Sequence, residues 1–466
     1  MSMLSQEQSF FFVGVAGSGM SAIAEYLAGK GFSISGSDRK FSSADGDALR
    51  AQLEMTGVKV FPQDGSGIQK NLSAIVVSSA IEESNPDIKR ALELGIPRMH
   101  RSEMLAKISE SVKTICVSGT SGKSSVTGMI WHILHEAGLS PSFLSGAALV
   151  SLEKQGRIGN SFTGSGEWLV AEADESDGTL VRYSPEIGVI LNIGKDHKEI
   201  AELQEIFATF SNNITAKNKT LIVNEADELA NAFSVNHLDD FGLEAKAGVQ
   251  GMDFKPEGYS IAFRVRHQGE LVSCKLPLPG RHNMMNALAA IAVALKVGVS
   301  LRQCADALSS FAGIHRRHQI LGIFHGVTVV DDFAHNPAKI AASIRAAQDF
   351  TKGRVLAYFQ PHGFGPTRFL RNDLVQAISE ALRSQDAAFL SEIYYAGGTV
   401  SRDISSADLV RDLLAKNVAA HYSAERLECG HRMVQFAKPG DTILVMGARD
   451  PSLSDFAQKI AEELAK

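Results

Sequence analysis

The sequence predicts an α/β protein whose parallel sheets are spread over about three domains. Short apolar runs alternate with amphipathic helical patterns along the whole chain, which is typical of parallel sheets covered by helices. A glycine-rich loop follows the β-branched run at residues 114–117 and precedes a helical pattern, as in phosphate-binding folds. The chain has 466 residues, enough for three domains of about 150 residues each.

The first α/β stretch begins with a strand at residues 10–15 and is expected to end near Ser109. A glycine-rich turn follows this strand, and further strands are predicted at residues 32–37 and 74–79. The helix after the turn is indicated by apolar residues at helical spacing: Met20, Ile23, Ala24 and Leu27.

The second stretch is predicted to contain strands at residues 114–117, 168–171 and 187–191. Alternation over residues 259–276, interrupted by Gly269, indicates an antiparallel hairpin. An alanine-rich helix then runs from about residue 284 to 296 and stops at Gly298.

The third stretch opens with a strand at residues 327–333, followed by a helix with Pro337 in its first turn. Proline is tolerated there because that N–H has no helical partner. Three more strands, at residues 354–359, 387–393 and 442–446, alternate with helices up to the carboxyl terminus.

Composition excludes several functional classes. The net charge is −6 and no block of like charge occurs, so neither a nucleic acid nor a membrane surface is an expected partner. The amino terminus lacks the basic segment of a signal peptide, and no apolar run could span a bilayer. We therefore expect a cytoplasmic protein with reduced thiols at its four scattered cysteines, Cys116, Cys274, Cys304 and Cys429.

The strongest local signal is the loop at residues 117–124, with the sequence VSGTSGKS. Glycines allow backbone N–H groups to approach a triphosphate, Lys123 would neutralise the β and γ phosphates, and the Ser124 hydroxyl would bind Mg²⁺. The generic pattern has glycine where Val117 stands, so the match is incomplete. The simpler alternative is a glycine–serine turn with a solvated lysine.

Polar side chains follow the next two predicted strands. Glu172, Asp174, Glu175 and Asp177 end one of them, and Asn192, Asp196 and His197 end the other. Ligands of open α/β sheets lie at the carboxyl ends of strands, so these groups predict a metal–nucleotide site. Each cluster alone could be a solvated surface, and an isolated histidine such as His197 is more often structural.

These motifs, in this order, resemble the Mur ligase family, which builds the peptide stem of the bacterial cell wall. The family shares the incomplete phosphate loop. The other segments that carry the resemblance are VGVAGSGMS (13–21), SGSD (35–38), SSAI (78–81), EADESD (172–177), NI and DH (192–197), PGRHN and Asn286 (279–286), HRR (315–317), DDFAH (331–335), QPH (360–362) and MGA (446–448).

The resemblance implies a three-domain fold and an activity. The expected domains are a Rossmann-like domain for the UDP substrate at 1–110, a central P-loop ATP-binding domain at 111–320, and a Rossmann-like amino-acid-binding domain at 321–466. The implied reaction is ATP- and Mg²⁺-dependent: L-alanine is joined to UDP-N-acetylmuramate through an acyl phosphate, in peptidoglycan biosynthesis and hence in cell shape and division. A monomer or weak dimer is expected.

The resemblance also assigns roles to residues. Lys123, Glu172 and His197 would be catalytic, and Ser124, Glu172 and His197 would bind metal. The implied ATP contacts are Gly119, Thr120, Ser121, Gly122, Lys123, Ser124, Ser125, Asn283, Asn286, Arg317 and Asp332. The implied UDP-substrate contacts are Gly17, Ser18, Gly19, Met20, Ser37, Asp38, Ser78 and Arg101. The implied acceptor contacts are His335, His362 and Arg368, with Arg402 as a second choice.

The chemistry agrees with these roles. A carboxylate does not react with an amine in water because its oxygen is too poor a leaving group, and phosphorylation converts it to a mixed anhydride. Lys123 and metal ions would neutralise charge at the transferring phosphoryl group, and would then stabilise the oxyanion formed when the amine attacks. Some relatives place a carbamylated lysine behind the second metal; residues 199–216 contain no lysine, so none is expected here.

Departures from the family pattern leave the acceptor open. They include Ser121 in the phosphate loop, Lys198 and Glu199 after His197, and extra Gly and Pro before Arg368. Near the carboxyl terminus, Gly398 stands where the family has a glutamate, which Asp403 could replace, and Arg449 stands where a glycine is usual. A paralogue that adds another amine, such as the recycling ligase for a tripeptide, is therefore the alternative.

A third hypothesis is a redox or non-catalytic protein. Gly14, Gly17 and Gly19 followed by Asp38 resemble a dinucleotide fold, although their spacing is G-x-x-G-x-G rather than G-x-G-x-x-G. A UDP pyrophosphate would bind at the helix N-terminus through the same backbone N–H groups and helix dipole. The Lys123–Ser124 pair argues against the redox interpretation.

Overall fold

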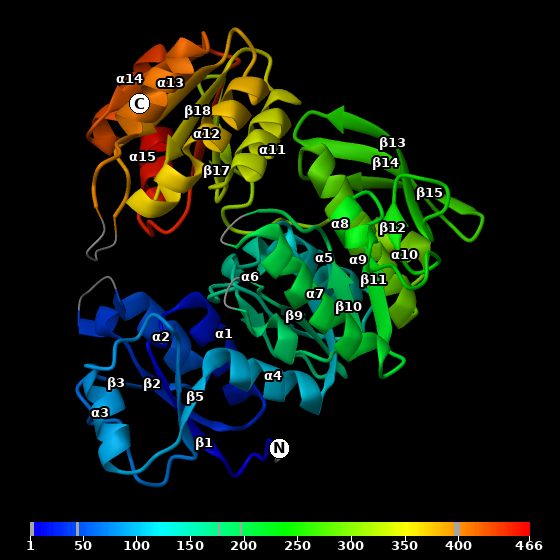
Figure 1. Ribbon diagram of the computed structural model, residues 1–466, viewed down its shortest axis with the longest axis vertical. Coiled ribbons are helices and arrows are strands. Elements are labelled where there is room, and N and C mark those ends of the chain that lie inside the picture. Colours follow the sequence, from blue (N-terminus) through cyan, green and yellow to red (C-terminus); the bar gives the residue numbers. More distant parts are fainter. Residues whose placement is uncertain (1–3, 43–45, 176–177, 196–197, 396–400) are drawn as a thin grey trace. The chain divides into compact units, whose positions relative to one another are not determined.

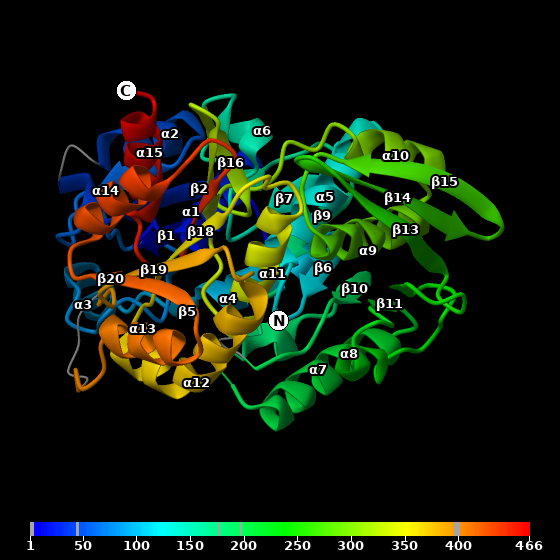
Figure 2. The same ribbon diagram turned by 90° about the horizontal axis from the view of Figure 1, so that it is seen from above.

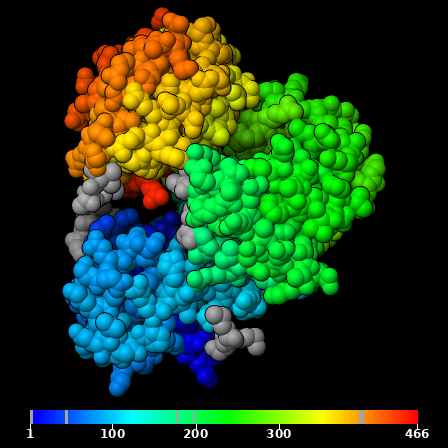
Figure 3. Space-filling view, in the orientation of Figure 1, coloured from blue at the N-terminus to red at the C-terminus, as the bar shows by residue number. Residues whose placement is uncertain are grey.

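The computed structural model describes residues 4–42, 46–175, 178–195, 198–395 and 401–466, and the remaining residues are drawn in grey (Figure 3). Its strands form four sheets. The chain divides into two compact units, one made of Met1–Met252, Arg264–Cys274 and Met285–Ile314 and the other of Asp253–Phe263, Lys275–Met284 and His315–Lys466. No helix in the described ranges is long and apolar enough to cross a bilayer.

The amino-terminal sheet has five parallel strands in the order β3-β2-β1-β4-β5 (Figure 1). The predicted strands at 10–15, 32–37 and 74–79 are confirmed as β1, β2 and β4. Its elements are β1 (Ser9–Val13), α1 (Ser18–Gly29), β2 (Ser33–Ser37), η1 (Arg39–Ser42), α2 (Asp47–Met55), β3 (Lys59–Phe61), β4 (Ala74–Val77), α3 (Pro86–Glu93), β5 (Arg98–His100) and α4 (Arg101–Ser111).

Strand β1 is apolar from Phe10 to Val13 because helices cover both faces of its sheet. Phe10 and Phe12 belong to a core cluster that also contains Met20 of α1. Phe11, which points the other way, belongs to a separate cluster with Ile88 of α3. The run of phenylalanines thus fills two cores at once.

The first sheet shares a core with the central sheet. Leu144 and Leu169 of the central sheet belong to the same cluster as Phe10 and Phe12. Hydrogen bonds also join α1 to the segment at β8: the Asn160 amide donates to the Ser18 carbonyl at 2.6 Å, and the Ser161 hydroxyl donates to Glu25 at 2.5 Å. These contacts explain why the first two α/β stretches form one compact unit.

The central sheet has six strands in the order β11-β10-β6-β9-β7-β8, all parallel except β8. Strands predicted from residues 114, 168 and 187 are confirmed as β6, β9 and β10. The elements are β6 (Lys113–Ser118), α5 (Lys123–Glu136), β7 (Ser142–Leu144), α6 (Val150–Glu153), β8 (Ser161–Phe162), β9 (Trp168–Glu172), η3 (Thr179–Arg182), β10 (Ile187–Ile190), α7 (Ile200–Thr215), β11 (Thr220–Val223) and α8 (Glu228–Asn231).

A smaller sheet, β12-β13-β14-β15, follows, and the predicted hairpin is confirmed as β14 and β15 joined at Gln268–Gly269. Helix α9, the predicted alanine-rich helix, runs beside this sheet (Figure 2), and a side chain at Gly251 of β13 would meet Leu288 of α9. The elements are β12 (Phe241–Gly242), β13 (Val249–Glu257), β14 (Ser260–His267), β15 (Glu270–Leu276), α9 (Arg281–Val297) and α10 (Leu301–Leu308).

The carboxyl-terminal sheet has the order β16-β17-β21-β18-β19-β20, in which β16 alone is antiparallel. The predicted strands β17, β18, β19 and β21 are confirmed, and Pro337 opens α11. The elements are β16 (Gln319–Phe324), β17 (Val327–Asp332), α11 (Pro337–Gln348), β18 (Val355–Gln360), α12 (Phe364–Ala381), β19 (Ala387–Ser391), α13 (Ser406–Ala415), β20 (Ala419–Ser423), α14 (Arg426–Phe436), β21 (Thr442–Gly447) and α15 (Leu453–Leu464).

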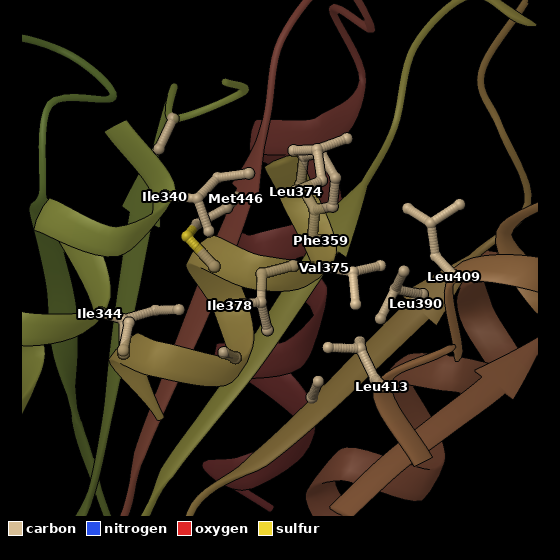
Figure 4. Packing of buried hydrophobic residues seen from close by; sticks show 14 of the residues in the cluster. Ile340, Ile344, Phe359, Leu374, Val375, Ile378, Leu390, Leu409, Leu413 and Met446 are labelled. Carbon is tan, nitrogen blue, oxygen red and sulfur yellow. The ribbon is translucent and has the colours of Figure 1, made fainter. Parts of the chain in front are cut away.

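Helices cover both faces of this sheet as well. On one face, Ile344 of α11, Ile378 of α12 and Leu413 of α13 pack with Phe359 and Leu390 of the strands (Figure 4). On the other face, helices α14 and α15 pack against alternate strand residues. The strands are therefore almost continuously apolar, because alternate residues fill two separate cores.

Candidate active site

The phosphate loop joins β6 to α5, and its backbone requires two of its glycines. Gly119 has φ +138° and Gly122 has φ +88°, conformations that other residues rarely adopt. A Cβ at Gly122 would lie 2.6 Å from Asn286 Oδ1, and one at Gly119 would lie 3.0 Å from Leu191 Cβ. The loop is thus packed against β10 and α9, with the start of α5 behind it.

Asn192, just past the end of β10, braces this loop. Its carbonyl accepts from the Thr120 N–H at 3.1 Å. Its side-chain Oδ1 accepts from the Ser121 N–H at 2.8 Å, and its Nδ2 donates to the Ser121 carbonyl at 3.0 Å. The sequence motif contained Asn192 but gave no hint of this function, because strand order decides which strand end lies beside the loop.

Lys123 is held inside the site. Its ammonium donates to the Gly119 carbonyl at 2.8 Å and to Glu175 Oε2 at 2.7 Å, with Asp174 Oδ1 at 3.6 Å. Burial acts to lower the pKa of Lys123, but Glu175, Asp174 and Glu172 outweigh it and raise that pKa above its ordinary value. The ammonium therefore stays charged at the start of α5, beside the loop.

Glu172, the last residue of β9, collects three donors on one carboxylate oxygen. Its Oε2 accepts from the Ser124 hydroxyl at 3.0 Å, the Ser145 hydroxyl at 2.8 Å and the Gly146 N–H at 3.0 Å. Mg²⁺ prefers oxygen ligands, and a buried hydroxyl beside a carboxylate at the phosphate loop supplies two of them. These residues therefore fit the metal that the sequence predicts. Ser145 was missed because it lies outside any sequence pattern.

Ser125 and Thr120, two further residues assigned to this site, lie on α5 and on the loop. Ser125 lies in the first turn of α5 and is largely buried. The Thr120 hydroxyl and the Gly194 N–H are 2.9 Å apart, a second tie between the loop and the β10 end. His197, the third predicted catalytic residue, lies outside the described residues, as do Asp196 and Asp177.

In the amino-terminal domain, the glycine turn and Asp38 come together at the ends of β1 and β2. Asp38 accepts from the N–H groups of Ala16 at 3.0 Å and Lys40 at 3.0 Å. The Arg101 guanidinium lies so close to Gly19 that a Cβ there would be 2.7 Å from Arg101 Nη1. Glycine at 19 thus allows an arginine to lie over the N-terminus of α1, where anions bind.

Five more residues predicted to contact the UDP substrate belong to this domain. Gly17 caps α1, Ser18 begins it, and the Met20 side chain points into the core. The buried Ser37 hydroxyl donates to Asp87. Ser78 directly follows β4 and its carbonyl accepts from the Ile81 N–H at 3.1 Å.

On α9, the buried Asn283 donates its amide to the Pro279 carbonyl at 2.8 Å. Asn286, one turn later, is the residue that lies against Gly122.

In the second compact unit, Asp332 ends β17 and is surrounded by donors. It accepts from the His318 N–H at 2.8 Å and the Ala334 N–H at 2.7 Å. Burial opposes its ionisation, but His318 and Arg317 hold the pKa of Asp332 below its usual value. The Arg317 guanidinium stacks over Phe333 at 4.7 Å from the ring centroid.

The two neighbours of Arg317 have left-handed backbone conformations, with φ of +54° at Arg316 and +51° at His318. Such strain persists only where surrounding contacts fix it, and it concentrates at functional sites. Here Arg316 is fixed by Asp331 at 3.1 Å and by the Gly447 carbonyl at 2.9 Å.

The predicted acceptor residues lie at the carboxyl ends of β17 and β18. The rings of His335 and His362 are 5.6 Å apart between centroids. Arg368, in the second turn of α12, is paired with Asp403. The Arg402 guanidinium lies 4.8 Å from the centre of the Tyr395 ring. Gly398 lies outside the described residues.

Three family models match the chain in succession. They are described as Mur ligase family, catalytic domain (residues 9–113), Mur ligase middle domain (residues 117–294) and Mur ligase, glutamate ligase domain (residues 316–449).

Individual relatives match over nearly the whole chain. A UDP-N-acetylmuramate–L-alanine ligase of Geobacter sp. strain M21 is 33% identical, with 96% of each chain covered. One from Cereibacter sphaeroides is 34% identical, with 94% of this chain and 93% of its own length covered. The crystal structure of UDP-N-acetylmuramate-alanine ligase from Thermotoga maritima superposes with a TM-score of 0.78 at 24% identity, covering 98% of both chains. A murein peptide ligase from Psychrobacter arcticus has a TM-score of 0.68 at 21% identity, covering 98% of this chain and 99% of its own.

Proposed function

Because the chain belongs to the Mur ligase family, we propose that it joins L-alanine to UDP-N-acetylmuramate in an ATP-dependent reaction of peptidoglycan synthesis. The observation that carries this proposal is the arrangement of Lys123, Ser124 and Glu172 at adjacent strand ends, in a chain that matches alanine-adding ligases over nearly its whole length. The runner-up acceptor is a peptide, as in the recycling branch of the family.

ATP and Mg²⁺ are the cofactors we propose. The metal would bind through Ser124 and Glu172, with His197 as a further ligand, and would supply positive charge at the transferring phosphoryl group. The N–H groups of Gly122, Lys123 and Ser124 would point at the phosphates, since those of Thr120 and Ser121 are held by Asn192. Lys123 would exchange its contact with Glu175 for phosphate oxygens.

The carboxylate of UDP-N-acetylmuramate would attack the γ phosphorus, which releases ADP and leaves an acyl phosphate. The amine of L-alanine would then attack the acyl carbon, and inorganic phosphate would leave. Lys123 contributes to both steps because negative charge develops first on the phosphoryl oxygens and then on the tetrahedral oxyanion.

We divide the ligands among three domains, at 1–110, 111–320 and 321–466. The UDP moiety is assigned to the first, where Arg101 and the N-terminus of α1 offer positive charge. Asn283, Asn286 and Asp332 are proposed to contact the nucleoside of ATP, and Arg317 its phosphates. The reaction is placed in the cytoplasm, in a monomer or weak dimer.

L-alanine is assigned to the carboxyl-terminal domain. Its carboxylate calls for an arginine, whose planar fork matches it with two parallel hydrogen bonds. Arg368 is the candidate: it is 44% exposed and its present partner, Asp403, is 58% exposed, so an incoming carboxylate can replace that partner at small cost. His335 and His362 follow β17 and β18, the two strands on either side of β21.

Phosphate release tests the function. Purified protein is incubated with ATP, Mg²⁺ and UDP-N-acetylmuramate, and L-alanine, other amino acids and the tripeptide are added one at a time. L-alanine should give the fastest release, together with a product heavier by one alanine residue. Lys123→Ala should abolish release, whereas Lys217→Ala, at an exposed lysine, should not.

The outcomes separate the hypotheses. Release with the tripeptide but not with L-alanine would replace the acceptor and retain the ligase. No release with any amine, in protein that is folded and binds UDP-N-acetylmuramate, would overturn the proposed function.

A further inference from the structure

Glu225, His237 and Asp240 form a cluster away from the phosphate loop. They lie where the chain leaves β11 and returns to β12, and one ligand atom from each lies within 4.8 Å of the others. The backbone closes this segment, because the Glu225 N–H donates to the Phe241 carbonyl at 2.9 Å and the Gly248 N–H donates to the His237 carbonyl at 2.7 Å. The cluster is therefore held by fixed backbone on both sides.

The three side chains present two buried acids to one accessible imidazole. His237 Nδ1 lies 2.5 Å from Glu225 Oε1 and 4.0 Å from Asp240 Oδ2. The carboxylate side chains are 2% and 0% exposed, whereas the imidazole is 56% exposed. A solute can reach the cluster from the histidine side.

One oxygen of the two buried acids has no hydrogen-bond partner among the described residues. This oxygen is Glu225 Oε2, which is buried. Asp240 accepts from the Val223 N–H at 2.8 Å and the Ser234 hydroxyl at 2.5 Å, both of them neutral donors. An unpaired buried carboxylate oxygen is unfavourable, so a cation that binds it would stabilise the folded segment.

We propose that Glu225, His237 and Asp240 bind a transition-metal dication, best matched by Zn²⁺. One imidazole nitrogen and two carboxylates are a mixed donor set that suits Zn²⁺, whereas Mg²⁺ and Ca²⁺ prefer oxygen alone. Donors of a tetrahedral zinc site lie about 3.4 Å apart. The separations of His237 Nδ1 from the two carboxylates, 2.5 and 4.0 Å, bracket that value. Solvent on the exposed side would complete the coordination.

This site is separate from the proposed catalysis. It lies past the end of β11, the edge strand of the central sheet, two strands from the phosphate loop. The bound metal would tie the segment between β11 and β12 to the sheet edge, so its main effect is expected on stability. The competing explanation is a protonated His237 that pairs with both carboxylates without any metal.

Metal titration decides between these explanations. Full-length protein stripped with a chelator is titrated with Zn²⁺ by calorimetry, and separately with Co²⁺, whose visible absorption reports ligand binding. Glu225→Gln and His237→Ala should each weaken binding at the tightest site by at least about tenfold, because even second-shell losses cost 10–100-fold.

Two control variants identify the site. His431→Ala removes an exposed histidine that lies 2.7 Å from Glu463, with no third metal-binding group beside it among the described residues. This variant should bind Zn²⁺ like the wild type. Glu172→Gln removes the carboxylate of the phosphate-loop site and should also retain this binding. Unchanged Zn²⁺ affinity in both Glu225→Gln and His237→Ala, or loss of the tightest site in Glu172→Gln alone, would overturn the proposal.

Discussion

Replacing Asn192 with alanine should weaken ATP binding although Asn192 is given no contact with ATP. The change deletes the two side-chain hydrogen bonds that hold the Ser121 peptide, at 2.8 and 3.0 Å. Each such bond contributes about 0.5–1.5 kcal/mol, so the loop loses about 1–3 kcal/mol of preorganisation. At 1.4 kcal/mol per factor of ten, the Kd for ATP should rise about 5-fold to 150-fold.

Calorimetric titration with ATP and Mg²⁺ measures this effect. The matched control is Asn213→Ala, at a half-buried asparagine on α7 whose amide donates to the Val181 and Tyr183 carbonyls at 2.7 and 3.3 Å. The control should lose stability but keep its ATP affinity. An unchanged Kd in a folded Asn192→Ala protein, or an equal loss in both variants, would refute the bracing role.

Three further predictions concern charge, pH and backbone strain. Glu175→Gln removes the carboxylate nearest to the Lys123 ammonium, which is 13% exposed, and leaves the more distant Asp174 at 3.6 Å. The unliganded protein should therefore lose about 1–3 kcal/mol of unfolding free energy. ATP with Mg²⁺ should then raise the melting temperature of the variant more than that of the wild type. An equal rise in both proteins would contradict the proposal that Lys123 exchanges Glu175 for phosphate oxygens. Burial lowers the pKa of His132 from 6.5, so the unfolded state binds more protons and wild-type stability falls as pH drops below about 6.5. Urea denaturation should show a flatter pH dependence from 7 to 5 in His132→Gln; the same slope would contradict this origin. Arg449 has φ +67°, so Arg449→Gly should raise the unfolding free energy by about 0.5–1 kcal/mol in urea denaturation, whereas Arg449→Ala should not. Equal effects of the two substitutions would exclude backbone strain at this position.

Much of the fold could be predicted because its strands are buried on both faces. The continuous run Phe10–Phe12 fills two cores, and such runs are distinct in sequence. The phosphate loop was equally clear, since its glycines, Lys123 and Ser124 act through local backbone geometry.

Contacts across the sheets could not be predicted. Asn192 lies 71 residues from Ser121, and Ser145 lies 27 residues from Glu172. Which strand ends become neighbours depends on strand order, and the sequence pattern does not encode it. The core shared by Phe10 and Leu169 could not be predicted for the same reason. Removing the first domain would expose Leu169 and so disturb the central domain as well. Such a truncation is therefore a poor test of UDP-substrate binding.

The central claim, that a carboxylate is activated by phosphorylation, is tested most directly with oxygen isotopes. UDP-N-acetylmuramate labelled with ¹⁸O in its carboxylate is converted with ATP, Mg²⁺ and L-alanine, and the released phosphate is examined by mass spectrometry. An acyl phosphate transfers one labelled oxygen to each phosphate, because the amine displaces phosphate with the oxygen that was once part of the carboxylate. Phosphate carrying one ¹⁸O is the predicted result, and unlabelled phosphate formed together with the amide product would contradict the account.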